Sequence, residues 1–327
     1  MKKRICCLLL AAVFLFGAVS LSACKRENGS GKPRIVATIF PVYDWIMNLL
    51  GEEADRAEVT LLMHNGADLH NFQPSVKDVA TVSGCDLFIY VGGESDEWVE
   101  DALKEAVNRE MLTVNLLELL GDDAKEEELV EGMQEEEEHE HKGEEEEEPE
   151  LDEHVWLSLK NASRFVQEIA AKLGELDPDR AANYRKNAET YAEKLSALDR
   201  RYAETVQNAA RKTLLFGDRF PFRYLTDDYG LNYYAAFVGC SAETEASFAT
   251  IATLAKKADE LNLRVILELE SANGSIAQTI RENTVSKDQT ILKMDSLQSS
   301  TLADHEAGIT YLSVMEQNLA VLAQALQ

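Results

Sequence analysis

DPDRAANYRKNAETYAEKLSALDRRYAETVQNAA, residues 177–210, has the pattern of one long helix. Asp177 is a suitable N-cap, and Pro178 suits the first helical position, where its missing N–H costs nothing. The apolar side chains recur at three- and four-residue intervals and form one narrow stripe. The stripe consists of Ala181, Tyr184, Ala188, Tyr191, Leu195, Leu198, Tyr202 and Ala209. Such a helix extends about 50 Å at 1.5 Å per residue, so we expect it to lie across two separate bodies.

Short β-rich segments alternate with amphipathic segments on both sides of this helix. We expect strands at 34–39, 58–63, 86–91, 111–116, 212–217, 231–238, 264–269 and 289–294. Helices are expected at 42–50, 75–83, 96–108, 158–174, 221–228, 247–260, 275–284 and 307–326. This alternation predicts the α/β class: two Rossmann-like lobes, each a four-stranded, mostly parallel sheet with flanking helices, bridged by the long helix. The predicted lobes are residues 34–176 and 211–327.

The first residues resemble a secretion signal. Residues 1–4 are basic, and 5–19 form an apolar run that is too short to span a membrane. The small residues before Cys24 resemble a lipobox, which implies cleavage after residue 23 and acylation of Cys24; an ordinary cleavage site beside a chance cysteine is the alternative. Residues 24–33 would form a polar tether. We therefore expect a protein anchored by lipid on the extracytoplasmic face of a cell membrane.

Negative charge is concentrated in one tract. The formal net charge is −27, and residues 122–153 contain nineteen acidic residues and two lysines. Such a tract buries too little surface to offset its ordering entropy, so we expect it to lack fixed structure without metal. A surface of this charge favours cations and excludes nucleic acid as a partner. A solvated loop that keeps the protein soluble is the alternative, but His139 and His141 lie in the densest part of the tract.

Polar residues follow several of the expected strands. Open α/β sheets bind ligands beyond the carboxyl ends of their strands. His70 follows the second strand, His154 opens a helix after the acidic tract, and Asp295 follows the last strand. Imidazoles and a carboxylate from separate strand ends suit a divalent transition metal. Taken singly, His70 could instead bond to backbone and Asp295 could cap a helix.

At these positions the sequence resembles the substrate-binding lipoproteins of zinc and manganese ABC transporters. GADLHNFQP (66–74) is similar to the first ligand motif of that family, and DEHVWL (152–157) is similar to the second. Further likeness is found at 93–103, 229–237, 243–247 and 304–326. The resemblance implies a metal held between two lobes, with His70, His154 and Asp295 as ligands, and docking of the loaded protein on a membrane permease.

One position departs from the family pattern. The family's third ligand, a histidine or glutamate, falls at Arg219, and arginine cannot bind a metal. Asp218 can supply an oxygen instead, and Glu270 is an outside candidate for the same role. Arg219 can also pair with an acid of the site. We regard His64 as incidental.

The resemblance implies a monomeric, non-enzymatic protein that captures Zn²⁺ and delivers it to an ABC permease. Zinc members often carry a loop rich in histidine and acid at the position of the tract, so His139 and His141 are expected to collect zinc weakly. The same role for Mn²⁺ stays open because of Arg219, and an additional adhesin role stays open as well. A metal-dependent hydrolase is a weaker alternative, because the chain has no His-Glu-x-x-His motif.

Two cysteines besides Cys24 remain in the expected mature chain, Cys85 and Cys240. An extracytoplasmic location would permit a disulfide. Because the two residues fall in different predicted lobes, we expect two separate thiols.

Overall fold

The computed structural model describes residues 31–134, 150–241 and 245–327, and every element below belongs to the unit Pro33–Gln327. The expected signal peptide, Cys24, His139 and His141 lie outside the described residues. Within the described part, no helix combines the length and apolarity needed to cross a membrane.

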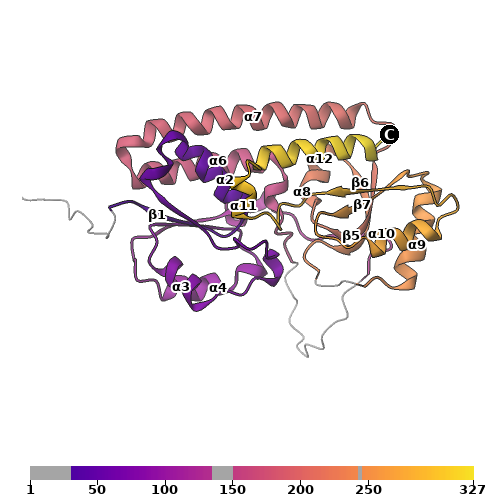
Figure 1. Ribbon diagram of the computed structural model, residues 1–327, viewed down its shortest axis with the longest axis horizontal. Coiled ribbons are helices and arrows are strands. Elements are labelled where there is room, and N and C mark those ends of the chain that lie inside the picture. Colours follow the sequence, from indigo (N-terminus) through magenta and orange to yellow (C-terminus); the bar gives the residue numbers. More distant parts are fainter. Residues whose placement is uncertain (1–30, 135–149, 242–244) are drawn as a thin grey trace, which may run out of the picture. The chain divides into compact units, whose positions relative to one another are not determined.

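The first lobe contains a four-stranded parallel sheet in the order β2-β1-β3-β4 (Figure 1). Its strands are β1 Arg34–Ala37, β2 Glu58–Leu61, β3 Leu87–Tyr90 and β4 Leu112–Asn115. Helices α2 Phe40–Leu50 and α6 Leu159–Leu176 cover one face, and α3 Val76–Ser83 and α4 Trp98–Lys104 cover the other. Shorter elements are η1 Gly51–Arg56, η2 Leu69–Asn71, η3 Glu94–Asp96, α5 Leu116–Leu120, η4 Gly121–Asp123 and η5 Val155–Leu157.

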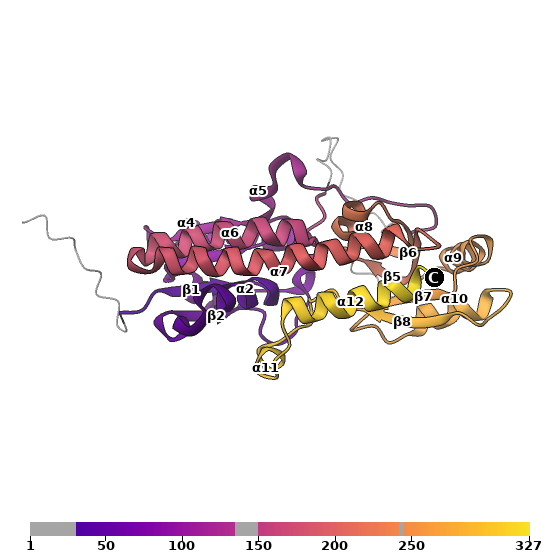
Figure 2. The same cartoon turned by 90° about the horizontal axis from the view of Figure 1, so that it is seen from above.

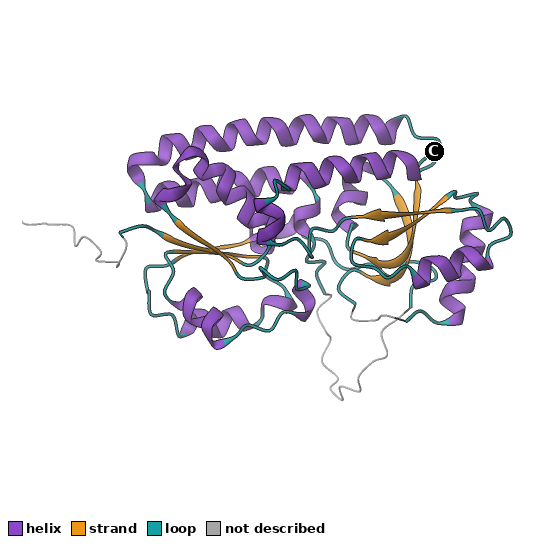
Figure 3. Ribbon diagram, viewed as in Figure 1, coloured by secondary structure: helices purple, strands orange, loops and turns teal. Residues whose placement is uncertain are grey.

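The second lobe also has a sheet flanked by helices (Figure 3). Its strand order is β6-β5-β7-β8, again all parallel. Its strands are β5 Thr213–Phe220, β6 Asn232–Val238, β7 Val265–Leu269 and β8 Thr290–Met294. Its helices are α8 Arg223–Tyr229, α9 Phe248–Glu260, α10 Ser275–Asn283, α11 Leu302–Glu306 and α12 Tyr311–Ala325. Both sheets reverse their strand order beside their first strand, where α/β sheets form a ligand crevice.

Helix α7, Ala181–Gln207, runs along both lobes (Figure 2). In its first half Tyr191 donates a hydrogen bond to Asp44 of α2 (3.4 Å), and in its second half Tyr202 donates to the carbonyl of Met315 in α12 (2.6 Å). The predicted first turn is the separate 3-10 segment η6, Pro178–Arg180. The predicted fold class, two four-stranded α/β lobes bridged by one long helix, is confirmed.

The two lobes share one hydrophobic core. A single cluster of buried side chains extends from Ile35 in β1 to Leu326 after α12 and includes the apolar stripe of α7. Trp156 joins the lobes at its centre: its indole N–H donates to the carbonyl of Ser296 (2.9 Å), and its own carbonyl accepts from the Tyr311 hydroxyl (2.7 Å). Because packed cores resist deformation, this continuity favours a rigid relation between the lobes.

The prediction that the whole acidic tract lacks fixed structure is wrong for its two ends, 122–134 and 150–153. Glu131 pairs with Lys257 of α9 (2.6 Å), and Glu128 pairs with Arg223 of α8 (3.3 Å). The backbone N–H of Gln134 donates to a carbonyl of β6 (2.9 Å). Basic side chains and a strand edge of the second lobe therefore bind these flanks. The charge of the tract alone could not predict these partners, because they lie elsewhere in the sequence. Residues 135–149 lie outside the described part.

Candidate metal centre

The two predicted ligand histidines meet between the lobes. His70 lies in η2, after β2, and His154 caps η5, after the acidic tract. Their Nε2 atoms are 3.1 Å apart although the residues are 84 positions apart in sequence. Two imidazoles that bind one Zn²⁺ at 2.0–2.1 Å in a tetrahedral site have nitrogens about 3.3 Å apart. The pair is therefore already spaced to bind one ion.

Carboxylates hold the other nitrogen of each ring. Asp152 Oδ1 lies 3.1 Å from His154 Nδ1, and Glu153 Oε2 lies 3.4 Å from His70 Nδ1. Ser95 Oγ also lies 3.0 Å from His70 Nδ1. A carboxylate on Nδ1 orients an imidazole and leaves Nε2 free for a metal. Asp152 and Glu153 directly precede His154, but the sequence analysis assigned them no role.

These contacts shift the protonation of the site. Burial disfavours a charge on His154, but the Asp152 carboxylate outweighs it, and the pKa of His154 is raised above its ordinary value of 6.5. Burial likewise acts to raise the pKa of Glu153, but hydrogen bonds to His70 and Ser95 hold it below the usual range. The Glu153 carboxylate therefore stays ionised beside His70, which makes the site attractive to a cation.

Cys240 is the third possible ligand beside the histidines. Its Sγ and one nitrogen from each of His70 and His154 all lie within 4.8 Å of one another, and no other group of three potential ligands occurs in the described ranges. Cys240 follows β6, and burial raises the pKa of its thiol. Cys85 and Cys240 both carry free thiols, as expected. The sequence analysis missed Cys240 because a single cysteine after a strand gives no metal signal.

The predicted carboxylate ligands lie outside this group. Asp218 lies in β5, near its carboxyl end, because the strand continues past the predicted residue 217 to Phe220. Its two oxygens accept the backbone N–H groups of Arg219 (2.8 Å) and Leu269 (3.1 Å). Asp218 as a ligand remains a prediction.

Asp295 follows β8 as expected, and its carboxylate accepts the backbone N–H of Leu297 (2.7 Å). Burial and the nearby Glu270 raise the pKa of Asp295 to about 6. Glu270 itself accepts hydrogen bonds from the Ser296 backbone and hydroxyl. Gln298, which also follows β8, is the side chain that reaches His154. Its Nε2 lies 3.1 Å from the His154 Nε2. Asp295 as a ligand also remains a prediction.

Arg219 is bound to an acid of the site. Its Nη2 lies 2.7 Å from Oδ2 of Asp68, two residues before His70. Burial acts to raise the pKa of Asp68, but Arg219 holds it below the usual value. The arginine at the family's third ligand position therefore links the two lobes through a salt bridge. His64 is exposed, with Nδ1 3.0 Å from the carbonyl of Leu62, outside the group.

Comparison with known proteins agrees with this fold and site. The family model "ZnuA: Zinc-uptake complex component A periplasmic" matches residues 35–325. The chain belongs to the ZnuA family.

Curated ZnuA-family relatives cover almost the whole of this chain. The zinc-binding lipoprotein AdcA of Streptococcus pneumoniae serotype 4 is 35% identical over 98% of this chain, which spans 61% of AdcA. The high-affinity zinc uptake system protein ZnuA of Bacillus subtilis is 32% identical over 97% of this chain and 96% of that protein. The chain thus spans about three fifths of the length of the streptococcal relatives.

Solved structures share the two-lobed architecture. The Zn(II)-bound ZnuA-like domain of S. pneumoniae AdcA superposes with a TM-score of 0.69 at 31% identity, over 90% of this chain and 99% of that domain. The metal-dependent lipoprotein YcdH of B. subtilis gives 0.72 at 28% identity, over the same shares.

In this ZnuA-family chain an acidic cavity reaches His70 and Cys240. Its volume is about 350 Å³. The lining residues are His70, Glu94, Ser95, Glu97, Glu150, Leu151, Glu153 and Cys240. Four carboxylates beside two ligand-type side chains raise the local concentration of cations. The end of the acidic tract forms part of this wall.

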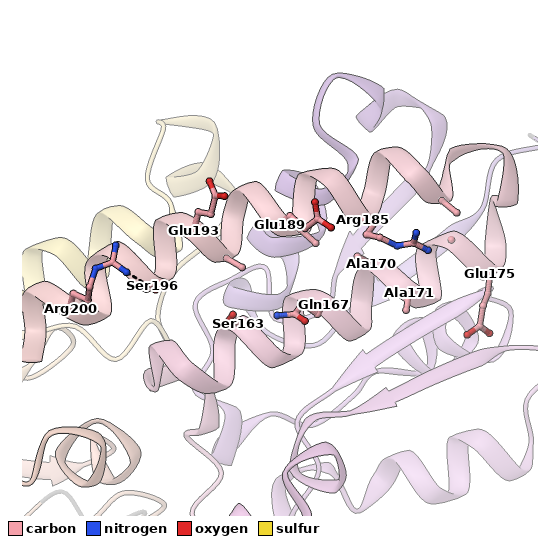
Figure 4. A pocket seen from close by; sticks show the side chains of 14 residues that line it. Ser163, Gln167, Ala170, Ala171, Glu175, Arg185, Glu189, Glu193, Ser196 and Arg200 are labelled. Atoms are coloured by element: carbon pink, nitrogen blue, oxygen red, sulfur yellow. Dashed lines mark hydrogen bonds between the residues drawn. The ribbon is translucent and has the colours of Figure 1, made fainter.

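A larger groove of about 1230 Å³ lies along α6 and α7 (Figure 4). Alanines such as Ala170 and Ala171 form part of its lining, with Glu189, Arg185 and other polar residues around them. The lining includes no histidine or cysteine. The groove therefore lacks the nitrogen and sulfur donors that a zinc site uses.

Proposed function

We propose that this chain is an extracytoplasmic binding protein that captures Zn²⁺ between its lobes and delivers it to an ABC permease. The observation that carries this proposal is the 3.1 Å separation of His70 Nε2 and His154 Nε2, each ring oriented by a carboxylate. The zinc named for its relatives supports the same ion. The site binds an ion for transport and catalyses no reaction.

The placement of the site supports the proposed delivery to a permease. His70 and His154 belong to the first lobe, while Gln298 and Arg219 reach them or their neighbours from the second lobe. An ion bound here contacts both lobes, so a permease that binds both can distinguish loaded from empty protein. A lipid on Cys24 would hold the protein beside that permease, and His139 and His141 would collect zinc weakly near the cavity.

Native mass spectrometry of the zinc-equilibrated mature chain tests the proposal. We expect one tightly held zinc ion in both the full chain and a variant lacking residues 135–149, and additional weakly held ions only in the full chain. Competition with manganese should leave zinc in the tight site. Loss of the tight ion on deletion of 135–149, or its replacement by manganese, would contradict zinc capture between the lobes.

Zinc affinity is expected to fall as the pH is lowered. A protonated imidazole has no lone pair for the metal, and the raised pKa of His154 means that protonation begins at a higher pH than in a free histidine. Each proton that must leave lowers the affinity by up to about tenfold per pH unit. Titrations against a chelator of known pH dependence, between about pH 7.5 and 5.5, measure this. A constant affinity over that range would exclude histidine ligands.

A further inference from the structure

The structure points to Cys240 as the third metal ligand, in the place that the family gives to histidine. Its thiol would release its proton to solvent when the ion binds, and the resulting thiolate favours zinc over manganese. This inference rests on the proposed function, because it names a ligand of the same site. Sγ of Cys240 and nitrogens of His70 and His154 lie within 4.8 Å of one another. Zinc bonds of about 2.0–2.1 Å to nitrogen and 2.3 Å to sulfur require only small side-chain movements from this arrangement.

The backbone of the second lobe fixes Cys240 against the histidines. Gly239 lies so close to His154 that a Cβ at this position would be 3.0 Å from Cε1 of the ring. The backbone N–H of Cys240 donates to Glu127 Oε1 (3.0 Å), in the bound flank of the acidic tract. The thiol therefore reaches the site from the end of β6, whereas both histidines come from the first lobe. A metal coordinated by all three would link the two lobes through its ligands.

The other side chains at this edge have different partners. Arg219 cannot ligate, and Asp68 holds its guanidinium. Both oxygens of Asp218 accept backbone N–H groups of the second sheet. Among the residues described, Cys240, two residues after β6, is the second-lobe donor grouped with both rings.

Gln298 offers a neutral fourth position. Its amide lies against His154, and its buried Oε1 has no hydrogen-bond partner in the described structure. Rotation of the amide would direct this oxygen toward the same nitrogen and hence toward the ion. Two imidazoles, one thiolate and an amide oxygen make a softer set than the oxygen-rich shells that manganese prefers.

Cobalt substitution tests the thiolate directly. Co²⁺ bound by the unmodified chain should show an intense sulfur-to-cobalt charge-transfer band in the near ultraviolet. Cys240→Ser should remove this band and reduce the preference for zinc over manganese. It should also lower the zinc affinity by about 10- to 100-fold or more, because losing even a residue that only supports a ligand costs about that much. Cys85→Ser is the matched control, since Cys85 is buried in the first lobe beside Met111, and it should leave band and affinity unchanged.

Alkylation of the unmodified chain provides a second measurement that does not depend on the folding of a variant. One equivalent of zinc should protect Cys240 from reaction with a thiol reagent. If zinc binds tightly but the cobalt band is absent and Cys240 stays reactive, the thiolate ligand is wrong and zinc capture stands. If neither metal binds the unmodified chain, the proposed function fails and Cys240 as a ligand fails with it.

Discussion

His70→Ala is expected to lower the zinc affinity on the order of 100-fold. The apparent binding free energy of structural zinc, about 10–16 kcal/mol, divided among four ligands gives about 3 kcal/mol for each. His70 is half-buried and its Nε2 faces that of His154, so the substitution removes a ligand while changing little of the core. Competition with a chromophoric chelator at neutral pH measures the affinity.

His64→Ala is the matched control for this variant. It makes the same chemical change in the same loop region, but His64 is exposed and lies outside the ligand group. Its zinc affinity should equal that of the unmodified chain. Equal losses of zinc affinity in the two variants, or no loss in His70→Ala, would contradict a metal site at His70 and His154.

Trp156→Ala is expected to lower the free energy of unfolding by about 3–5 kcal/mol. The side chain is fully buried, and its replacement leaves a cavity at the junction of the two lobes. It also leaves the Ser296 carbonyl without its indole donor, which adds the cost of an unpaired buried group. Urea unfolding of the zinc-free chain, followed by circular dichroism, measures the difference.

Trp98→Ala provides the comparison, because Trp98 is only partly buried at the outer face of the first lobe. Trp98→Ala should lower the free energy of unfolding clearly less than Trp156→Ala does. The ring of Trp156 also lies 5.3 Å from that of His154, so Trp156→Ala should weaken zinc binding while Trp98→Ala does not. Equal destabilisation by the two substitutions would contradict the central position of Trp156 between the lobes.

Periodicity predicted the fold because it depends on local geometry. The three- and four-residue spacing of Tyr184, Ala188 and Tyr191 requires one helical face, and these side chains are buried in α7. The alternation of strand and helix likewise predicted mostly parallel sheets. It did not reveal that both sheets have the same strand order, because strand order is set by contacts between segments distant in sequence.

The first-lobe part of the site was also accessible from the sequence. His70 and His154 stand in motifs that a family shares, and the end of a strand is where such a sheet binds ligands. The flanks of the acidic tract were not accessible, since the partners of Glu128 and Glu131 belong to α8 and α9 of the other lobe.

The sequence by itself determined the α/β class, the long bridging helix and the two histidines, because each follows from spacing along the chain or from a local motif. Only the tertiary structure decided which second-lobe side chains face those histidines. It brought Cys240 and Gln298 beside the rings and bound Arg219 to Asp68. Those contacts depend on how two sheets pack around one core, and side chains brought together in that way carry no common pattern in the sequence.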